Sequence, residues 1–116
     1  MLLLFNLNYS QLEGDSVVRI HGNWCGPGWT DGKAIDALAY KQKGGDFKGA
    51  CTDKLDCACR AHDKDCANTK GCSAKADRKL IRTALLVSLT TRNAALSAKA
   101  KLIVSGIAAA SLTRSR

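Results

Sequence analysis

The chain has 116 residues, six cysteines, few aromatic residues and a formal net charge of +8. This length suits one domain over residues 1–116, whose modest core would benefit from crosslinks. No linker or internal repeat divides the chain. The longest late apolar run, residues 102–112, is short and interrupted, which excludes a transmembrane span on this reading.

The even number of cysteines favours a disulfide framework and an oxidising compartment. A metal cluster in a reducing compartment is the alternative. A clear secretion signal is missing, because the apolar residues 1–5 lack a basic segment before them. They are either the trimmed start of a longer precursor or a first packed segment.

Positive charge is concentrated in the last third of the chain. No acidic residue follows Asp77, whereas eight cations do: Arg78, Lys79, Arg82, Arg92, Lys99, Lys101, Arg114 and Arg116. Such a one-signed segment indicates an anionic partner, which could be a membrane surface, a nucleic acid or another polyanion. A soluble basic face without a specific partner is the alternative.

The sequence pattern of the first half of the chain indicates little regular structure. In chain order we expect a weak helix or extended segment at 2–12, a strand-like run at 17–20, a Gly/Pro turn at 22–32, a helical turn at 33–40 and a polar loop at 41–49.

Three helices are expected in the second half, at residues 54–67, 74–91 and 94–112, so the predicted fold class is all-α. Thr52 or Asp53 caps the first helix and Ser73 the second, because these side chains accept hydrogen bonds from the free N–H groups of a first turn. Gly71 is a stop signal between them. Residues 113–116 are expected to fray.

The helix at 54–67 concentrates groups that crosslink, bind metal or move protons. At 3.6 residues per turn, one side carries Asp56, Cys59, Asp63 and Cys66, with His62 beside them. A disulfide on this side would hold the helix while His62 and Asp63 point into a cleft. A solvated acidic helix with structural cysteines is the alternative.

The segment Cys25-Gly26-Pro27-Gly28 cannot be a helix interior or a central strand. Its glycines let the backbone curl, so that carbonyl oxygens can converge on a hard cation such as calcium. A carboxylate must balance the charge, and Asp63 is a candidate. A tight turn flanked by tryptophans is the alternative.

Asp77 falls on the apolar face of the helix at 74–91, where a carboxylate is costly unless it is paired. His62 on the preceding helix is the expected partner, because the two helices should form an antiparallel hairpin. Such a hydrogen bond would fix the imidazole tautomer. Otherwise Asp77 is a first-turn acid that interacts with the helix dipole.

These motifs together resemble the secreted phospholipase A2 superfamily, in the manner of its compact plant, microbial or viral members. Trp24-Cys25-Gly26-Pro27-Gly28 is similar to the calcium loop of that family, and Asp56, Cys59, His62 and Asp63 fit its Asp-x-x-Cys-x-x-His-Asp helix. The resemblance implies an all-α fold in which the calcium loop is followed by two antiparallel disulfide-linked helices and a third C-terminal helix.

The resemblance also implies a calcium-dependent hydrolase of the sn-2 ester of glycerophospholipids. His62 would be the general base on water, Asp77 would orient it, and the Gly26 N–H would help to stabilise the oxyanion. Calcium would be bound by Asp63 and the carbonyl oxygens of Trp24, Gly26 and Gly28, and a Cys25–Cys59 bridge would join loop to helix.

The implied partner is a phospholipid membrane surface, anionic in view of the basic half, with no nucleic acid and a monomeric enzyme. The implied location is extracellular, or a virion-borne domain of a larger chain. Two departures from the family stand out: the tyrosines that often support the aspartate are not evident, and Cys51, Cys57, Cys66 and Cys72 leave three pairings open.

Two further functions remain open. Cys57, Cys59, His62, Cys66 and Cys72 offer enough ligands for a zinc module with a basic nucleic-acid-binding tail, although the spacing is not that of a familiar finger. A catalytically silent secreted binding protein on the same scaffold is the other. We assign His21 no role beyond a surface or turn residue.

Overall fold

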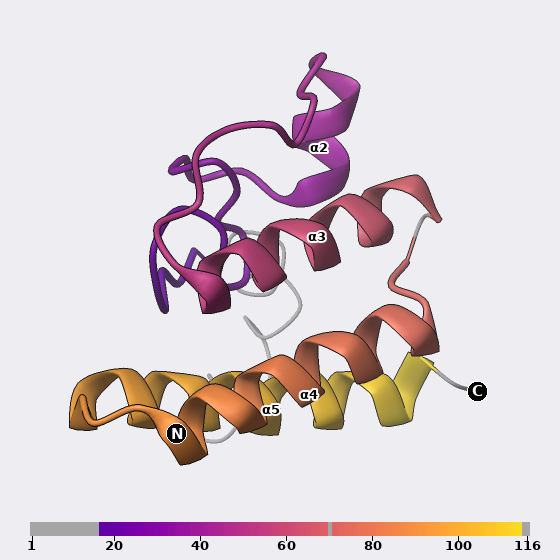
Figure 1. Cartoon of the computed structure of the whole chain (residues 1–116). Helices are drawn as coiled ribbons and strands as arrows, with labels where there is room; N and C mark the ends of the chain where they lie inside the picture. The colour runs from indigo at the N-terminus through magenta and orange to yellow at the C-terminus, as the bar shows by residue number, and fades with distance from the viewer. Residues whose placement is uncertain (1–16, 70, 115–116) are drawn as a thin grey trace, which may run out of the picture.

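The computed structural model describes residues 17–69 and 71–114, and within them it is all-helical apart from two isolated bridges (Figure 1). The four helices are α2 (Ala37–Gln42), α3 (Lys54–Asn68), α4 (Ala74–Thr90) and α5 (Ala94–Arg114). The all-α prediction is therefore confirmed for this part of the chain. The segment expected at 2–12 lies outside the described residues.

Side-chain caps set the starts of the helices. Asp53 accepts a hydrogen bond from the Asp56 N–H at the start of α3, and Ser73 accepts one from the Ala76 N–H at the start of α4. Both caps were among those predicted from the sequence. The predicted end of the last helix was wrong, because α5 continues through Arg114 rather than fraying after residue 112.

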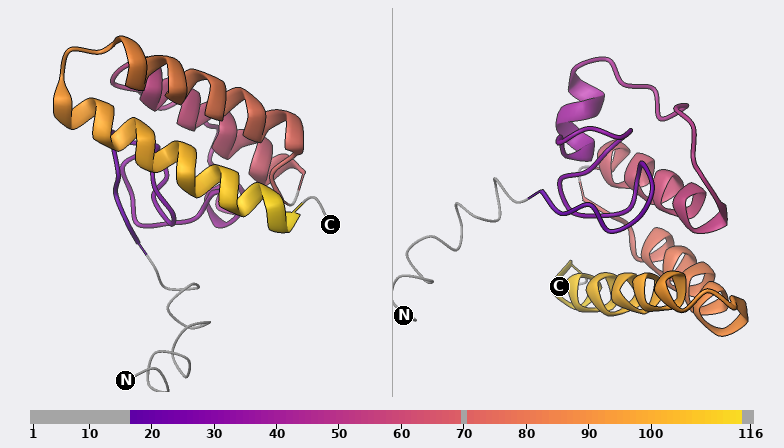
Figure 2. Two further views of the ribbon diagram at one scale, coloured as in Figure 1. Left: turned by 90° about the horizontal axis from the view of Figure 1, so that it is seen from below. Right: turned by 90° about the vertical axis from the view of Figure 1, so that its left-hand side faces the viewer.

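Each helix contacts the next along the chain, from α2 to α5. Figure 1 shows the chain turning back after α3 and again after α4, and Figure 2 shows α4 and α5 side by side beneath α3. The irregular segment before α2 packs against α3 on the side away from α4 and α5. Short connections explain why sequential helices are spatial neighbours.

The strand-like run at 17–20 forms no strand. Its backbone pairs instead with the Gly/Pro turn, through Val18 N–H to the Pro27 carbonyl and Ile20 N–H to the Cys25 carbonyl, each at 2.9 Å. Two hydrogen bonds satisfy the backbone of the run but build no sheet. The expected helical turn at 33–40 begins later, at Ala37, where Asp36 caps it.

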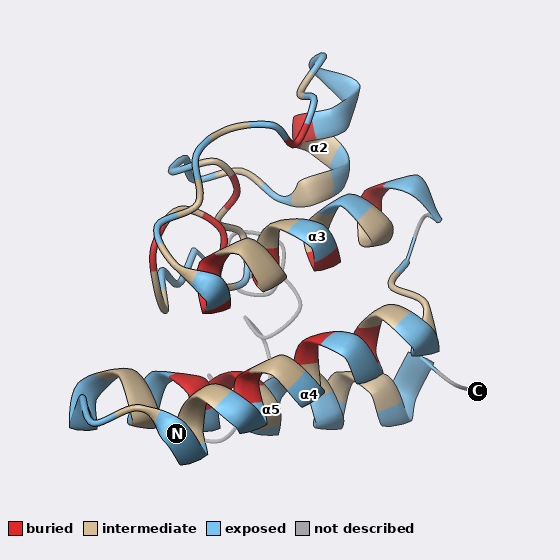
Figure 3. Ribbon diagram, in the orientation of Figure 1, coloured by how far each residue is buried: buried red, intermediate tan, exposed pale blue. Residues whose placement is uncertain are grey.

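The core joins an aromatic cluster to the helical hairpin (Figure 3). Trp24, Tyr40 and Phe47 pack against one another with ring centroids 4.8 to 6.1 Å apart. Between α4 and α5 the buried residues include Ala84 and Ala100, both fully buried. Leu80 and Ile103 are buried in the same core, and Val87, Leu96, Val104 and Ile107 pack against it.

The apolar run expected at residues 102–112 is only part of a longer apolar helix. That helix, the 21-residue α5, is by length and composition apolar enough to cross a membrane. Only about a tenth of its most apolar stretch is buried within the protein. The residues that interrupt the run, Ser105, Gly106 and Ser111, lie within the helix, because single Ser or Gly residues cost a helix only about 1 kcal/mol or less.

The Gly22→Ala substitution should destabilise the fold by about 2 to 4 kcal/mol. Gly22 has φ +62°, and a Cβ there would lie 2.3 Å from Cγ of the buried Asp56. The matched control is Gly44→Ala, where φ is +93° but no atom lies within 4 Å. That control should cost only the backbone strain, about 1 kcal/mol. Equal losses in urea denaturation would contradict the close approach.

Candidate functional site

His62 and Asp77 meet between α3 and α4. The His62 Nε2 lies 2.7 Å from the Asp77 Oδ1, and both side chains are buried. Because Asp77 accepts, Nε2 carries the proton and Nδ1 of the neutral ring keeps its lone pair. The predicted Asp–His pair is therefore present, and it leaves one ring nitrogen able to accept a proton.

A third residue joins this pair from α5. The Arg114 Nη2 donates to the same Asp77 Oδ1 at 2.6 Å, and the Arg114 side chain is only 29% exposed. Three helices thus meet at one carboxylate. Sequence reasoning assigned Arg114 to the frayed tail, because nothing in the local pattern links residues 37 positions apart.

The charge state of Asp77 follows from these contacts. Burial alone would raise the pKa of Asp77, but the hydrogen bonds from His62 and Arg114 and the positive charge of Arg114 outweigh it. The pKa of Asp77 therefore lies below the usual aspartate value. An ionised Asp77 is the form that orients His62.

Asp63, the next residue after His62, has no side-chain donors like those of Asp77 in the part of the chain that the structure describes. Its Oδ2 is buried and has no hydrogen-bond partner among the described residues, which is also true of the second oxygen of Asp77, Oδ2. Burial, and secondarily the charge of Asp56, raise the pKa of Asp63 well above the ordinary value. A buried carboxylate without a partner is costly, and a bound cation would remove that cost.

Asp56 ties the glycine turn to α3. Its buried carboxylate accepts hydrogen bonds from the backbone N–H groups of Asn23 and Trp24 at 3.0 and 2.8 Å, and from that of Thr52 at 2.9 Å. The Cys25–Cys59 disulfide adds a covalent link between turn and helix. Trp24 is fully buried, and its Nε1 donates to the Ala50 carbonyl.

The turn itself is closely packed at Gly26. A Cβ at Gly26 would lie 1.8 Å from the Val18 carbonyl oxygen, and φ is +137°, so only glycine fits. The Gly26 carbonyl accepts the Trp29 N–H at 3.2 Å, which leaves this oxygen a second lone pair. Gly28 also has positive φ, as a curled loop requires.

The residues present fit a calcium ion. Asp63 supplies an unpartnered buried oxygen, and the turn that carries Trp24, Gly26 and Gly28 is fixed to the same helix by Asp56 and Cys59. Carboxylate and carbonyl oxygens are the donors that calcium prefers. The charge of Asp56 acts on the pKa of Asp63, so the loop anchor and the orphaned carboxylate lie near one another.

The remaining cysteines pair as Cys51–Cys57 and Cys66–Cys72, which closes the pairing that the sequence left open. The first joins the loop to α3, and the second joins α3 to the segment just before α4. None of the three bridges joins α3 directly to α4. His62, Cys66 and Cys72 form a group whose ligand atoms lie within 4.8 Å of one another.

That group is a poor metal site in this oxidised form. All six cysteines are in disulfides, whereas the metal ligand is the free thiolate. The zinc alternative, built on Cys57, Cys59, His62 and Cys66, would need these bridges reduced. The Cys66 Sγ instead packs against the His62 ring, 3.6 Å from Nδ1.

A cavity of about 300 Å3 lies between α3 and α4, with His62 in its wall. Ala58, Ala61 and Leu80 give it an apolar lining, and Lys75 and Lys79 line it as well. The imidazole of His62 borders this cavity, which is large enough for a small organic group. Asp65 and Ser73 also line it, so apolar, cationic and anionic groups all border the cavity.

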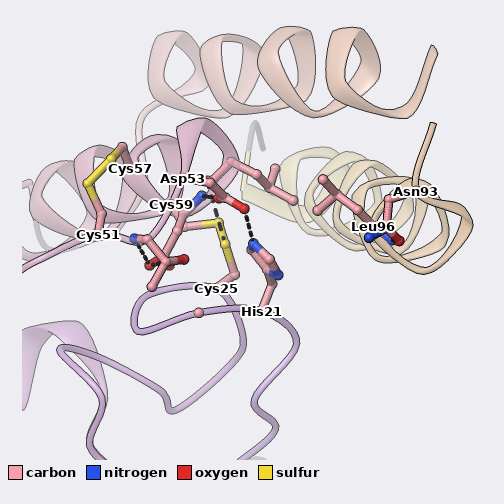
Figure 4. A network of polar contacts seen from close by, with 12 residues as sticks. His21, Cys25, Cys51, Asp53, Cys57, Cys59, Asn93 and Leu96 are labelled. Atoms are coloured by element: carbon pink, nitrogen blue, oxygen red, sulfur yellow. Dashed lines mark hydrogen bonds and ion pairs between the residues drawn. A yellow bond between two sulfur atoms is a disulfide. The ribbon is translucent and has the colours of Figure 1, made fainter. Parts of the chain in front are cut away.

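A second histidine pair was missed from the sequence. The His21 Nε2 lies 2.7 Å from the Asp53 Oδ2, beside the Cys25–Cys59 bridge (Figure 4). Asp53 also caps α3. Its carboxylate therefore binds both the start of that helix and His21, the residue before the glycine turn. Burial would raise the pKa of Asp53, but hydrogen bonds from the Asp56 N–H and from His21 lower it overall.

Comparisons with protein-family models, with curated proteins and with solved structures find no match for this chain.

Replacing Asp63 by Asn should stabilise the protein in the absence of calcium. The pKa of Asp63 is raised on folding, so its ionisation destabilises the folded state as the pH rises above the ordinary aspartate pKa. At pH 8 in chelator, Asp63→Asn should raise the free energy of unfolding by roughly 1 to 3 kcal/mol.

Calcium should reverse that order. The wild type should gain about 2.7 kcal/mol at a calcium concentration a hundred times Kd, and Asp63→Asn should gain nothing. Thermal denaturation with and without calcium measures both effects. The control is Asp46→Asn, an exposed aspartate that should change neither value. A calcium-dependent gain in Asp63→Asn would contradict the assignment.

Arg114→Gln should make the fold more sensitive to acid. The depressed pKa of Asp77 contributes stability above the ordinary aspartate pKa, and this stability is lost as the pH falls through the folded pKa. Without Arg114 the folded pKa rises, so acid unfolding should begin at higher pH, with about 1 to 2 kcal/mol lost near neutrality. The exposed Arg82→Gln is the control. Coincident pH–stability curves would disprove the contact.

Proposed function

We propose that this protein is a calcium-dependent phospholipase A2, which hydrolyses the sn-2 ester of glycerophospholipids to a fatty acid and a lysophospholipid. One observation carries the proposal: the buried Asp63 Oδ2, which has no partner among the described residues, follows directly on His62, which is itself paired with Asp77. An oriented base that can take a proton from water, next to a carboxylate that can hold a polarising cation, is a combination suited to ester hydrolysis by water.

In this mechanism His62 accepts a proton from water at Nδ1 as the water attacks the ester carbonyl. Asp77 keeps the proton of His62 on Nε2 and stabilises the imidazolium that forms. The proton on Nδ1 then passes to the leaving alkoxide of the lysophospholipid. No serine or cysteine nucleophile is needed, which agrees with the pairing of every cysteine in a disulfide.

Asp63 and the carbonyl oxygens of Trp24, Gly26 and Gly28 would hold calcium. When bound, calcium supplies a positive charge that holds the substrate phosphate and stabilises the developing oxyanion. The Gly26 N–H is the chain's own donor to that oxyanion. Disulfide Cys25–Cys59 fixes the loop relative to His62, so these donors need little reorganisation.

This proposal includes the finer architecture inferred from the sequence: a single domain over residues 1–116, in which a calcium loop precedes an antiparallel pair of disulfide-linked helices and a third helix. The Cys66–Cys72 bridge at the connection from α3 to α4 supports the disulfide-linked pair. The His62–Asp77 contact supports their facing each other.

The three disulfides are compatible with an extracellular protein. We propose that it acts outside the cell, or as the virion-borne domain of a larger chain, as a monomer on anionic phospholipid membranes. The absence of acidic residues after Asp77 supports an anionic surface. Nucleic acid is not part of this proposal.

A catalytically silent binding protein on the same scaffold is the alternative that the sequence left open. The observed His62–Asp77 pair favours catalysis, because a binding protein has no need for an oriented buried base.

His62→Gln should abolish hydrolysis while leaving calcium binding intact. Loss of the general base should lower the rate of sn-2 fatty-acid release at least a hundredfold, measured on mixed phospholipid micelles with calcium. The matched control is His21→Gln, since His21 also pairs with an aspartate but lies at the cap of α3. Hydrolysis that survives His62→Gln would eliminate this mechanism.

A further inference from the structure

Helices α4 and α5 expose large apolar side chains that the core does not use. Leu85, Leu86 and Leu89 of α4 are 44%, 53% and 78% exposed, and Leu102 of α5 is 57% exposed. Figure 3 shows exposed stretches along both helices, away from α3. Soluble proteins rarely gather exposed leucines in this way without a partner.

Cations lie on the same side of α4 as these leucines. Arg78 and Arg82 precede Leu85, Leu86 and Leu89 at spacings of three and four residues, so all five point away from the buried Asp77, Leu80 and Ala84. The first half of this face is therefore basic and the second half is apolar. On α5, Lys99 and Lys101 are exposed next to Leu102.

We infer that this face of α4, which we call the hairpin surface (Arg78, Arg82, Leu85, Leu86 and Leu89), docks on an anionic lipid bilayer. Leucines would enter the boundary between headgroups and acyl chains, and the arginines would contact the anionic headgroups. This inference deepens the proposed function, since it names the surface by which the enzyme would reach its substrate.

The charges favour a bilayer over other occupants. A second copy docked through the same face would gather the Arg78 and Arg82 side chains of both copies in one interface, and no acidic side chain after Asp77 would compensate for them. A nucleic acid would gain nothing from the leucines, and α4 and α5 contain no aromatic residue on which bases could stack. An anionic bilayer is complementary to both the cations and the leucines.

Docking should not require the catalytic site. The full-length His62→Gln protein, in chelator, should therefore co-sediment with vesicles of phosphatidylglycerol and phosphatidylcholine, and much less with phosphatidylcholine alone. Leu85→Ser combined with Leu89→Ser should weaken binding at least tenfold. Arg78→Gln with Arg82→Gln should weaken binding roughly fivefold for each charge removed, and only at low salt.

Matched controls lie on the opposite side of the molecule. Leu38 of α2 is a leucine of 39% exposure, and Lys41 and Lys43 are exposed cations near it. Leu38→Ser, and Lys41→Gln with Lys43→Gln, should leave vesicle binding unchanged. Thermal denaturation verifies that each variant is folded, which is expected because the substituted side chains are exposed.

The inference is overturned if the leucine pair binds vesicles as well as the controls do, if the protein is a dimer that ignores vesicles, or if it binds nucleic acid but no vesicles. Hydrolysis of a dispersed short-chain phospholipid separates this failure from that of the proposed function. Activity on the dispersed substrate without vesicle binding refutes only the docking surface. Vesicle binding without any hydrolysis refutes only the enzyme.

Discussion

The Asp77 carboxylate is the interaction on which the rest of the structure depends. It is 1% exposed and receives both His62 from α3 and Arg114 from α5, while belonging to α4 itself. This carboxylate thereby links α3, α4 and α5. Both donors reach Oδ1 and offset part of the cost of burying this charge, while Oδ2 has no partner among the described residues. The same contacts orient the His62 ring.

Asp56 plays the corresponding part at the other end of α3. Two of its three backbone donors, Asn23 and Trp24, belong to the glycine turn, and the Cys25–Cys59 disulfide secures the turn covalently. Asp63 receives no donor at its buried Oδ2 within the described part of the chain, and neither does the second oxygen of Asp77. Asp63 differs from Asp77 in having no cationic partner there either, and we propose that a bound calcium ion supplies one.

The helices, their caps and the His62–Asp77 pair could be predicted from the sequence, because they follow from helical periodicity and from the cost of a buried charge. Arg114 and the His21–Asp53 pair could not, since each joins segments more than 30 residues apart whose meeting depends on the tertiary packing. The exposure of Leu85, Leu86 and Leu89 was hidden for a similar reason: an apolar residue on a helix does not reveal whether a neighbour covers it.

Product analysis is the measurement that tests the central claim most directly. A phosphatidylglycerol with different acyl chains at sn-1 and sn-2 is incubated with the full chain, and the released fatty acid is identified by mass spectrometry with calcium and with chelator. The account predicts the sn-2 acid and its lysophospholipid with calcium, and neither with chelator. Release from sn-1, release in chelator, or no release at all under either condition would contradict it.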